Sequence, residues 1–331
     1  MNKEWTEFLA SHAAPVQESA DIGCAMNDLS HYGLVRVEGE DAEQFLQGQM
    51  TNDMRQVTET HSNLAGWCNA KGRMMAGFRC FRRGEAFYLQ TPLENISLVL
   101  QRLSMYVLRS KVTISDAGDE LVRIGFTGIC AEALLQPFFE ELPERVNDVQ
   151  QQDQMTLIRV PGVSLRFEVI GPIGQIQEIW QTAAGQAQPV GENFWALQEI
   201  RAGIPTLYQS TSESFVPQMT NMQLIDGVSF TKGCYTGQEV VARMQYLGKL
   251  KRRMYLAHVS TATPPNPGDE LFAEGSTSEQ GTGKVVDAQA NGDGYDLLAV
   301  IEIASAEQQQ VCLGKNGPKL EILNLPYSYS E

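Results

Sequence analysis

The segment from Phe230 to Gly248 contains the residues of this chain that are best suited to chemistry. Cys234 lies between two glycines, Gly233 and Gly237, and a lysine, Lys232, stands two residues before it. Glycines this close together let the backbone adopt positive φ and turn its N–H groups toward one point. Such N–H groups and a nearby ammonium both stabilise a thiolate. We therefore predict that Cys234 is a reactive thiol on a tight turn and that Lys232 is its candidate cationic partner.

The element that must position this turn is a helix after Gly237, where Val240, Val241 and Met244 form an apolar stripe. The alternative is that Cys234 is a small buried residue and that the glycines are plain turn residues, since most free cysteines are inert core residues. A lysine in the same turn is too polar for a core turn and favours the reactive interpretation.

Residues 232–239 form a distinctive sequence, Lys-Gly-Cys-Tyr-Thr-Gly-Gln-Glu. It resembles the signature of the YgfZ family, whose members are similar to the folate-binding T-protein, the aminomethyltransferase of the glycine cleavage system. The same family resemblance is found at residues 29–39, 45–53, 194–205 and 215–221. The resemblance covers the chain from about residue 29 to the C-terminal Leu-Pro-Tyr-Ser at 325–328.

The resemblance implies that tetrahydrofolate is the ligand and that Tyr32 and Trp195 line its site. Tyr32 stands where the family commonly has a tryptophan, and an aromatic face there can stack on a pterin or aminobenzoyl ring. From its residues alone, Trp195 lies on an apolar helical patch with Leu197 and Ile200. Plain core packing of this large side chain is therefore an equal alternative.

Two departures from the related aminomethyltransferases bear on activity. Those enzymes carry an aspartate pair where this chain has Ala76 and Gly77, so the group that steers proton transfer is missing. The family's Leu/Ile-Glu-Ala-Gly pattern has Arg201 in place of its glutamate. A guanidinium cannot accept hydrogen bonds from a pterin. We expect no classical aminomethyltransferase activity.

Composition excludes several classes of protein. A chain of 331 residues is long enough for two or three domains, and 43% hydrophobic with 20% charged residues is typical of soluble globular proteins. A net charge of −15 argues against general binding to nucleic acid. No apolar run is long enough to span a membrane, and the N-terminus does not resemble a secretory signal. We expect a cytoplasmic protein that does not associate with membranes.

The cysteines and histidines show no ligand spacing. The six cysteines are Cys24, Cys68, Cys80, Cys130, Cys234 and Cys312. No two form a C-x-x-C pair, so their scatter predicts neither a disulfide framework nor a zinc or iron–sulfur site. The four histidines are also scattered, and His31, next to Tyr32, is expected at the surface. We predict no metal site and reduced thiols.

Hydrophobic periodicity predicts two α+β units with a similar order of strands and helices, followed by a segment of short strands. In the first unit, strands are expected at 34–37, 86–89 and 111–114, with a hairpin turn at 82–85 and helices at 41–49 and 93–103. In the second unit, strands are expected at 121–126, 155–160 and 165–170, with helices at 131–142 and 173–182. After residue 250, short strands with Pro and Gly turns are typical of a small β-barrel.

These patterns and the resemblance together predict an α+β protein. It has a T-protein-like folate-binding body made of two ferredoxin-like α+β units, followed by a C-terminal β-barrel. We place the body at residues 1–247 and the barrel at 248–331. Within the body, one unit comprises about residues 1–116 with 190–247, and the other comprises 117–189.

The function that the resemblance implies is support of iron–sulfur enzyme assembly or repair, with Cys234 as the reactive group. This role would affect tRNA modification through methylthiolating radical enzymes. Because the chain is strongly negative, we expect its link to tRNA to be indirect. One alternative is a tetrahydrofolate-dependent one-carbon (aminomethyl) transferase with a different acid or base. A second alternative is a non-catalytic folate-sensing module in which Cys234 is structural.

Overall fold

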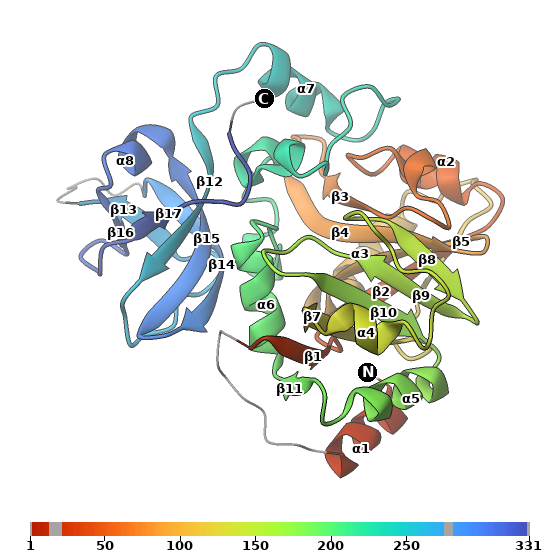
Figure 1. Ribbon diagram of the computed structural model, residues 1–331. Coiled ribbons are helices and arrows are strands. Elements are labelled where there is room, and N and C mark those ends of the chain that lie inside the picture. Colours follow the sequence, from red (N-terminus) through yellow and green to blue (C-terminus); the bar gives the residue numbers. More distant parts are fainter. Residues whose placement is uncertain (1, 13–21, 275–280, 330–331) are drawn as a thin grey trace. The chain divides into compact units, whose positions relative to one another are not determined.

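The computed structural model describes residues 2–12, 22–274 and 281–329, and the chain divides into two compact units (Figure 1). The first unit comprises Met1–Leu46, Met54–Asn63 and Phe78–Trp195. The second unit comprises Gln47–Asp53, Leu64–Gly77 and Ala196–Glu331. The domain boundary between residues 247 and 248 lies within the second unit and stays a prediction, as do the two sub-units of the body.

A six-stranded sheet in the first unit has the order β11-β1-β7-β10-β9-β8. Its strands are β1 (Cys24–Asp28), β7 (Val122–Gly128), β8 (Val149–Gln152), β9 (Met155–Arg159), β10 (Arg166–Gly171) and β11 (Gln188–Val190). Its helices are α1 (Lys3–Ser11), α4 (Ala131–Leu135) and α5 (Ile173–Ala183). The three strands predicted in this part of the chain are confirmed, whereas the helix predicted at 131–142 ends at Leu135.

One face of this sheet is apolar because alternate residues of a strand point to the same side. Ile124 and Phe126 of β7 and Phe167 of β10 pack there in a hydrophobic cluster with Trp5 of α1 and Trp180 of α5. All five side chains are at most 6% exposed, so this cluster is the main core of the first unit.

A five-stranded sheet has the order β3-β4-β5-β2-β6. Its strands are β2 (Tyr32–Glu38), β3 (Asn63–Cys68), β4 (Met74–Arg83), β5 (Ala86–Pro92) and β6 (Thr113–Asp116). The helical segments around it are α2 (Ala42–Gln47), η1 (Met54–Gln56), η2 (Leu93–Asn95) and α3 (Ile96–Ser104). The predicted hairpin is confirmed, since β4 and β5 pair antiparallel up to Arg83 and Ala86 and Gly84 turns between them with φ 55°.

The C-terminal part of the second unit is a curled, antiparallel six-stranded sheet, an open half-barrel, with the order β16-β13-β14-β15-β12-β17 (Figure 1). Its strands are β12 (Arg252–Val259), β13 (Glu270–Ala273), β14 (Gly283–Asn291), β15 (Gly294–Glu302), β16 (Val311–Leu313) and β17 (Glu321–Leu323), with α8 at Ile303–Glu307. Met254, Leu256 and Leu298 on one face pack with Ile200 and Val241. The α+β class predicted from the sequence is thereby confirmed.

The other helical segments of the chain are α6 (Glu192–Arg201), α7 (Gln238–Tyr246), η3 (Gln209–Thr211), η4 (Pro217–Thr220) and η5 (Met222–Leu224). Trp195 of α6 belongs to the first unit and Ile200 to the second. Among the residues that the structure describes, no helix has the length and apolar character that crossing a bilayer requires.

A disulfide joins Cys24 to Cys130 with their Cα atoms 5.6 Å apart, so the prediction that no cysteines pair is wrong. The two residues are 106 positions apart in sequence. Antiparallel pairing of β1 with β7 sets Cys24 opposite Gly128, and Cys130 follows two residues later. Only this long-range pairing brings the two thiols together, which spacing in the sequence does not reveal.

Candidate functional site

The turn that carries Cys234 leads directly into α7, as the sequence predicts. Gly237 precedes the helix with φ 84°, and a Cβ there would lie 2.4 Å from the carbonyl oxygen of Asn69. Gly233 is different, because its φ is not positive and a Cβ would meet no atom within 4 Å. Only Gly237 is therefore required by the backbone. Cys234 itself is exposed, so the alternative that buries it is wrong.

Lys232 is buried, with 5% of its surface exposed. Its ammonium donates to three backbone carbonyl oxygens, those of Gln47 at 2.8 Å, Met50 at 2.6 Å and Asn52 at 2.8 Å. The ammonium also lies 5.1 Å from the ring centroid of Tyr235. The argument that this lysine is too polar for a core turn is wrong, since backbone carbonyls replace the lost water. Its effect on the Cys234 thiolate stays a prediction.

The segment Gln47–Asp53, which receives Lys232, is itself held by side-chain hydrogen bonds. The Thr51 hydroxyl donates to the Gly227 carbonyl and accepts from the Gly66 amide, both at 2.7 Å. The Asn52 amide group donates to the carbonyls of Leu64 and Asp226. Two stretches of sequence that carry the family resemblance, 45–53 and 232–239, thus meet through Lys232 within the second unit.

Tyr32 and Trp195, the predicted folate-lining pair, lie in one cluster of the first unit. Tyr32 is half-buried, whereas Trp195 is 1% exposed. The Arg166 guanidinium lies 3.9 Å from the centroid of the Trp195 ring, and a Cβ on Gly125 would come within 2.3 Å of that ring. Trp195 therefore packs in the core, and its contact with folate stays a prediction.

The face of the six-stranded sheet that meets Trp195 carries buried polar side chains beside apolar ones such as Ile158 and Ile170, whereas the opposite face is apolar. Arg123, Thr127, Arg166 and Glu168 are buried on this side of β7 and β10, where Arg166 pairs with Thr127 and Glu168 with Gly125. Arg123 donates from Nη2 to the Tyr32 carbonyl at 2.8 Å. Burial lowers the pKa of Arg123, and Glu168 opposes that shift. The sequence predicted the strands β7 and β10 but not that their polar side chains would be buried together on one face.

Several polar atoms near this face lack a hydrogen-bond partner within residues 2–12, 22–274 and 281–329. They are Nε and Nη1 of Arg123, Oε1 of Gln90 and Oγ1 of Thr127. Gln90, on β5, donates from Nε2 to the Glu168 carboxylate at 3.1 Å. Orphaned buried polar atoms are uncommon in folded proteins and call for an explanation.

His31, which the sequence places at the surface, is half-buried: 21% of its side chain is exposed, but both ring nitrogens are inaccessible to solvent. Its ring lies 4.3 Å from the Tyr32 ring, and neither ring nitrogen has a hydrogen-bond partner in the described part of the chain. Burial, reinforced by the charge of Arg123, lowers the pKa of His31 to about 4. The ring is therefore neutral near pH 7.

Arg201, the residue at the family's glutamate position, is engaged within the second unit. Its Nε lies 3.2 Å from the Asp296 carboxylate, which also accepts from Asn291 at 2.9 Å and pairs with Nδ1 of His258 at 2.8 Å. These bonds direct the Arg201 cation to the C-terminal sheet. Ala76 is fully buried and offers no carboxylate.

Asp287 is a buried acid in the second unit that no pattern in the sequence indicates. It lies at an irregularity of β14 and accepts from the Ala288 amide and from the Tyr208 hydroxyl, the latter at 3.3 Å. Burial raises the pKa of Asp287 to about 7.

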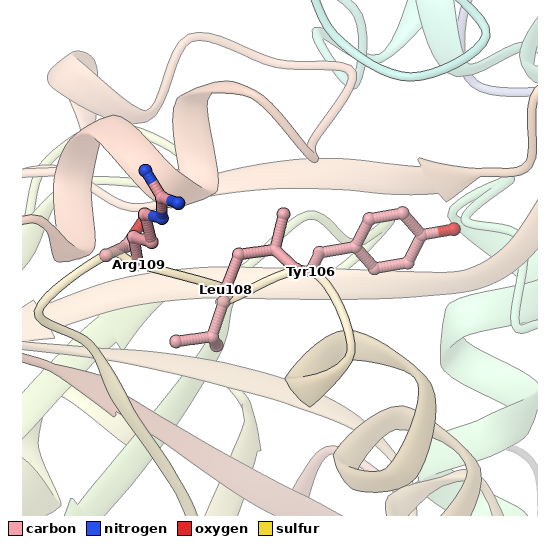
Figure 2. A pocket seen from close by; sticks show the side chains of 5 residues that line it. Tyr106, Leu108 and Arg109 are labelled. Carbon is pink, nitrogen blue, oxygen red and sulfur yellow. The ribbon is translucent and has the colours of Figure 1, made fainter.

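A shallow hollow lies along the loop Tyr106–Ser110, which follows α3 (Figure 2). Leu108 is 89% exposed and has φ 47°, and Tyr106 is 40% exposed. An exposed apolar loop is typical of a contact surface. None of the predicted site residues lies in it. Over the part of the chain that the structure describes, no group of three or more His, Cys, Asp and Glu side chains is arranged to hold a metal ion.

Comparison with known proteins decides the family. The model of the GCVT N-terminal domain matches residues 2–225. The tRNA-modifying protein YgfZ of Klebsiella pneumoniae (strain 342) is 33% identical over 316 residues, which span 95% of this chain and 96% of that protein. The tRNA-modifying proteins YgfZ of Shigella boydii serotype 4 (strain Sb227) and Escherichia coli O45:K1 (strain S88 / ExPEC) are each 33% identical over 314 residues, with the same coverage. The chain belongs to the YgfZ family.

The fold of this YgfZ-family chain is that of the glycine cleavage T-protein. The aminomethyltransferase T of Bartonella henselae superposes with a TM-score of 0.70 at 17% identity, covering 93% of this chain and 87% of that one. The T-protein-like body with ferredoxin-like units and a C-terminal barrel, expected from the resemblance, is therefore confirmed, and the barrel is an open half-barrel. In this chain, Cys234 and Lys232 lie in the second unit, and Tyr32 and Trp195 lie in the first.

Proposed function

We propose that this chain is a folate-binding YgfZ-family protein that acts in tRNA modification. Support comes from relatives named as tRNA-modifying proteins, which match it over 95% of its length. The match to the GCVT N-terminal domain, in a family related to the folate-binding T-protein, supports the folate part. Because tRNA is modified in the cytoplasm, the proposal includes a cytoplasmic location.

The observation that carries the proposal is the exposed thiol of Cys234 on a turn fixed by buried Lys232. An exposed thiol is accessible to a partner, and access together with thiolate character governs its reactivity. Cys234 is the reactive group in this proposal, and Lys232 holds the turn and adds positive charge to it. The partners are iron–sulfur enzymes, including those that methylthiolate tRNA. With a net charge of −15, the chain acts on tRNA through these enzymes.

The ligand of the first unit in this proposal is tetrahydrofolate, which when bound supplies a carrier of one-carbon units. The residues there fit such a molecule in their chemistry. Tyr32 and Trp195 offer aromatic surface, and Arg123 and Gln90 offer buried polar atoms that lack hydrogen-bond partners in the described structure. Tyr32 and Trp195 would line the site. Arg201, bound to Asp296, does not take the role of the family's glutamate.

The transferase alternative is not our proposal, because Ala76 and Gly77 provide no acid or base. Supplying aminomethyl-loaded carrier protein and tetrahydrofolate should release no ammonia above background. Sustained ammonia release would instead favour the transferase.

Complementation tests the proposal in cells that lack their own YgfZ protein. The Cys234→Ser variant should leave methylthiolated nucleosides in tRNA digests at the level of the deletion strain. Cys312→Ser is the matched control, since Cys312 is another free cysteine of the second unit, and it should restore them. Full rescue by Cys234→Ser would remove the thiol from the proposed function.

A further inference from the structure

We propose that Arg123 and Gln90 form a subsite for the lactam edge of the pterin ring, the C4 carbonyl with its neighbouring N3–H group. The inference rests on the proposed binding of tetrahydrofolate and names the residues that would form hydrogen bonds with its pterin ring. It assigns a role to the buried polar side chains on β7 and β10, which the family resemblance does not explain.

The position of the subsite follows from strand pairing in the first unit. Glu168 on β10 lies opposite Gly125, two residues from Arg123 on the same face of β7. Gln90 on β5 reaches this face by donating from Nε2 to the Glu168 carboxylate. Arg123 reaches Tyr32 through Nη2, and Trp195 packs on Gly125. Gln90 is thus hydrogen-bonded to Glu168, and Arg123, on which the Glu168 charge acts, is bonded to the Tyr32 carbonyl.

The charge of the cluster selects a neutral ligand group. The carboxylates of Glu168, Asp28 and Asp116 all act on the Arg123 guanidinium and favour its charged form. The cation is therefore already balanced by buried or nearby acids. An additional carboxylate or phosphate from a ligand would be repelled by them. A ligand group at this place should be uncharged and polar.

The hydrogen-bonding capacity of the cluster selects a lactam. Nε and Nη1 of Arg123 are donors, and Oε1 of Gln90 is an acceptor; none of these atoms has a hydrogen-bond partner in the described residues. A pterin lactam presents the complement, an acceptor at its carbonyl beside a donor at N3. Arg123 and Gln90 are 5% and 6% exposed, so these atoms cannot rely on bulk water. Leaving them unpaired costs free energy that a fitting ligand would recover.

Direct binding to the full-length protein, measured by calorimetry, tests this assignment. The probes are tetrahydrofolate and its 4-amino analogue, tetrahydroaminopterin, which replaces the carbonyl acceptor with an amino donor and removes the N3 proton. We expect the analogue to bind about ten- to a hundredfold more weakly, as one mismatched buried hydrogen bond to a charged group predicts. The fragment p-aminobenzoylglutamate, which lacks the pterin, should show no dependence on Arg123.

Arg123→Lys keeps the charge that the surrounding carboxylates need but loses the planar fork of donors. It should weaken tetrahydrofolate binding about tenfold and reduce the preference over the 4-amino analogue. Arg82→Lys is the control, because Arg82 is a half-buried arginine of the same unit that pairs with Glu85 and not with the residues of the subsite. Unchanged thermal unfolding of both variants without ligand ensures that affinity and not folding is compared.

The outcomes separate this inference from the proposed function. If tetrahydrofolate binds but the 4-amino analogue binds equally well, or Arg123→Lys binds as the wild type does, the subsite is wrong and folate binding stands. If Arg123→Lys unfolds, the analogue comparison in the wild type decides alone. If tetrahydrofolate does not bind the wild type at all, both the subsite and the folate part of the proposed function fall.

Discussion

Two buried polar clusters of this chain differ in how their hydrogen bonds are completed. In the second unit, Lys232 and Thr51 are buried and bonded to backbone groups of neighbouring segments. In the first unit, Arg123 and Gln90 are equally buried, yet some of their polar atoms have no hydrogen-bond partner in the described structure. Side chains whose hydrogen bonds are completed, such as Lys232 and Thr51, act as a scaffold, although Oε1 of Gln49 in the same segment lacks a partner among the described residues; unpaired donors such as those of Arg123 leave capacity for a ligand. From this comparison we assign a structural role to the residues that hold the turn of Cys234, and we place the ligand-binding site in the first unit.

Removal of the Lys232 ammonium should have the largest effect. Lys232→Met leaves three buried carbonyls without their donor, and we expect a loss of about 3–5 kcal/mol in the free energy of unfolding, as for a broken buried charge network. Urea denaturation measures it. Lys249→Met, at an exposed lysine of the same unit, should change that free energy by less than about 0.5 kcal/mol. Similar values for the two variants would mean that Lys232 is not part of a scaffold.

Two isosteric threonine variants sharpen the comparison between the clusters. Thr51→Val breaks bonds to Gly227 and Gly66 and should cost about 1–3 kcal/mol of unfolding free energy. Thr127→Val removes a buried hydroxyl that makes no hydrogen bond to a described residue, so it should be neutral or stabilise by up to about 1 kcal/mol. Thermal unfolding of the apo-protein gives both values. Equal losses would abolish the distinction between a completed and an incomplete cluster.

The two glycines of the reactive turn should respond differently to alanine. Gly237→Ala places a Cβ against the Asn69 carbonyl at positive φ and should cost about 1–3 kcal/mol in unfolding free energy. Gly233→Ala enters open space and should stay within about 0.5 kcal/mol of the wild type. Denaturant titration of both variants checks the pair, and a costly Gly233→Ala would show that the turn is tighter there than its geometry implies.

The pH dependence of stability should report the buried ring of His31. Its folded pKa of about 4 lies below its ordinary value of 6.5, so the unfolded chain binds the proton first as the pH falls. This group therefore removes stability as the pH falls from 6.5 to 4, and His31→Gln should make the slope of the unfolding free energy against pH more negative in that window. Asp287, with its pKa raised from 3.8 to about 7, gives a slope of the opposite sign between pH 4 and 7, and Asp287→Asn should make the slope more positive there. A profile unchanged in His31→Gln would contradict the burial of the ring.

The sequence predicted those parts of the fold that depend on local patterns. Alternating residues marked the strands around 122–128 and 166–171, and Gly84 and Gly237 marked a hairpin and a helix start. These features depend on a few neighbouring residues, so composition and periodicity suffice. The position of Cys234 just before a helix was predicted for the same reason, since the glycines around it and the apolar stripe after Gly237 are local signals.

The residues that the sequence did not place depend on long-range pairing. Lys232 reaches carbonyls about 180 positions away, and Cys24 pairs with a cysteine 106 positions away. The polar face of the first unit exists only because β7 and β10 pair in the register that sets Glu168 opposite Gly125. A strand pattern shows which residues share a face but not which face of the sheet is covered by Trp195 or by an apolar helix.

The most direct test of the central claim, that the second unit presents a reactive thiol, is the rate of cysteine alkylation in the native protein. Iodoacetamide at pH 7.5, followed by mass spectrometry of peptides, compares Cys234 with Cys68 in one sample. Cys234 is exposed, whereas burial holds Cys68 at 0% exposure and raises its pKa to about 12. The account predicts that Cys234 is modified at least about tenfold faster than Cys68, since accessible thiolate sets the rate. Modification of Cys234 no faster than Cys68 would contradict it.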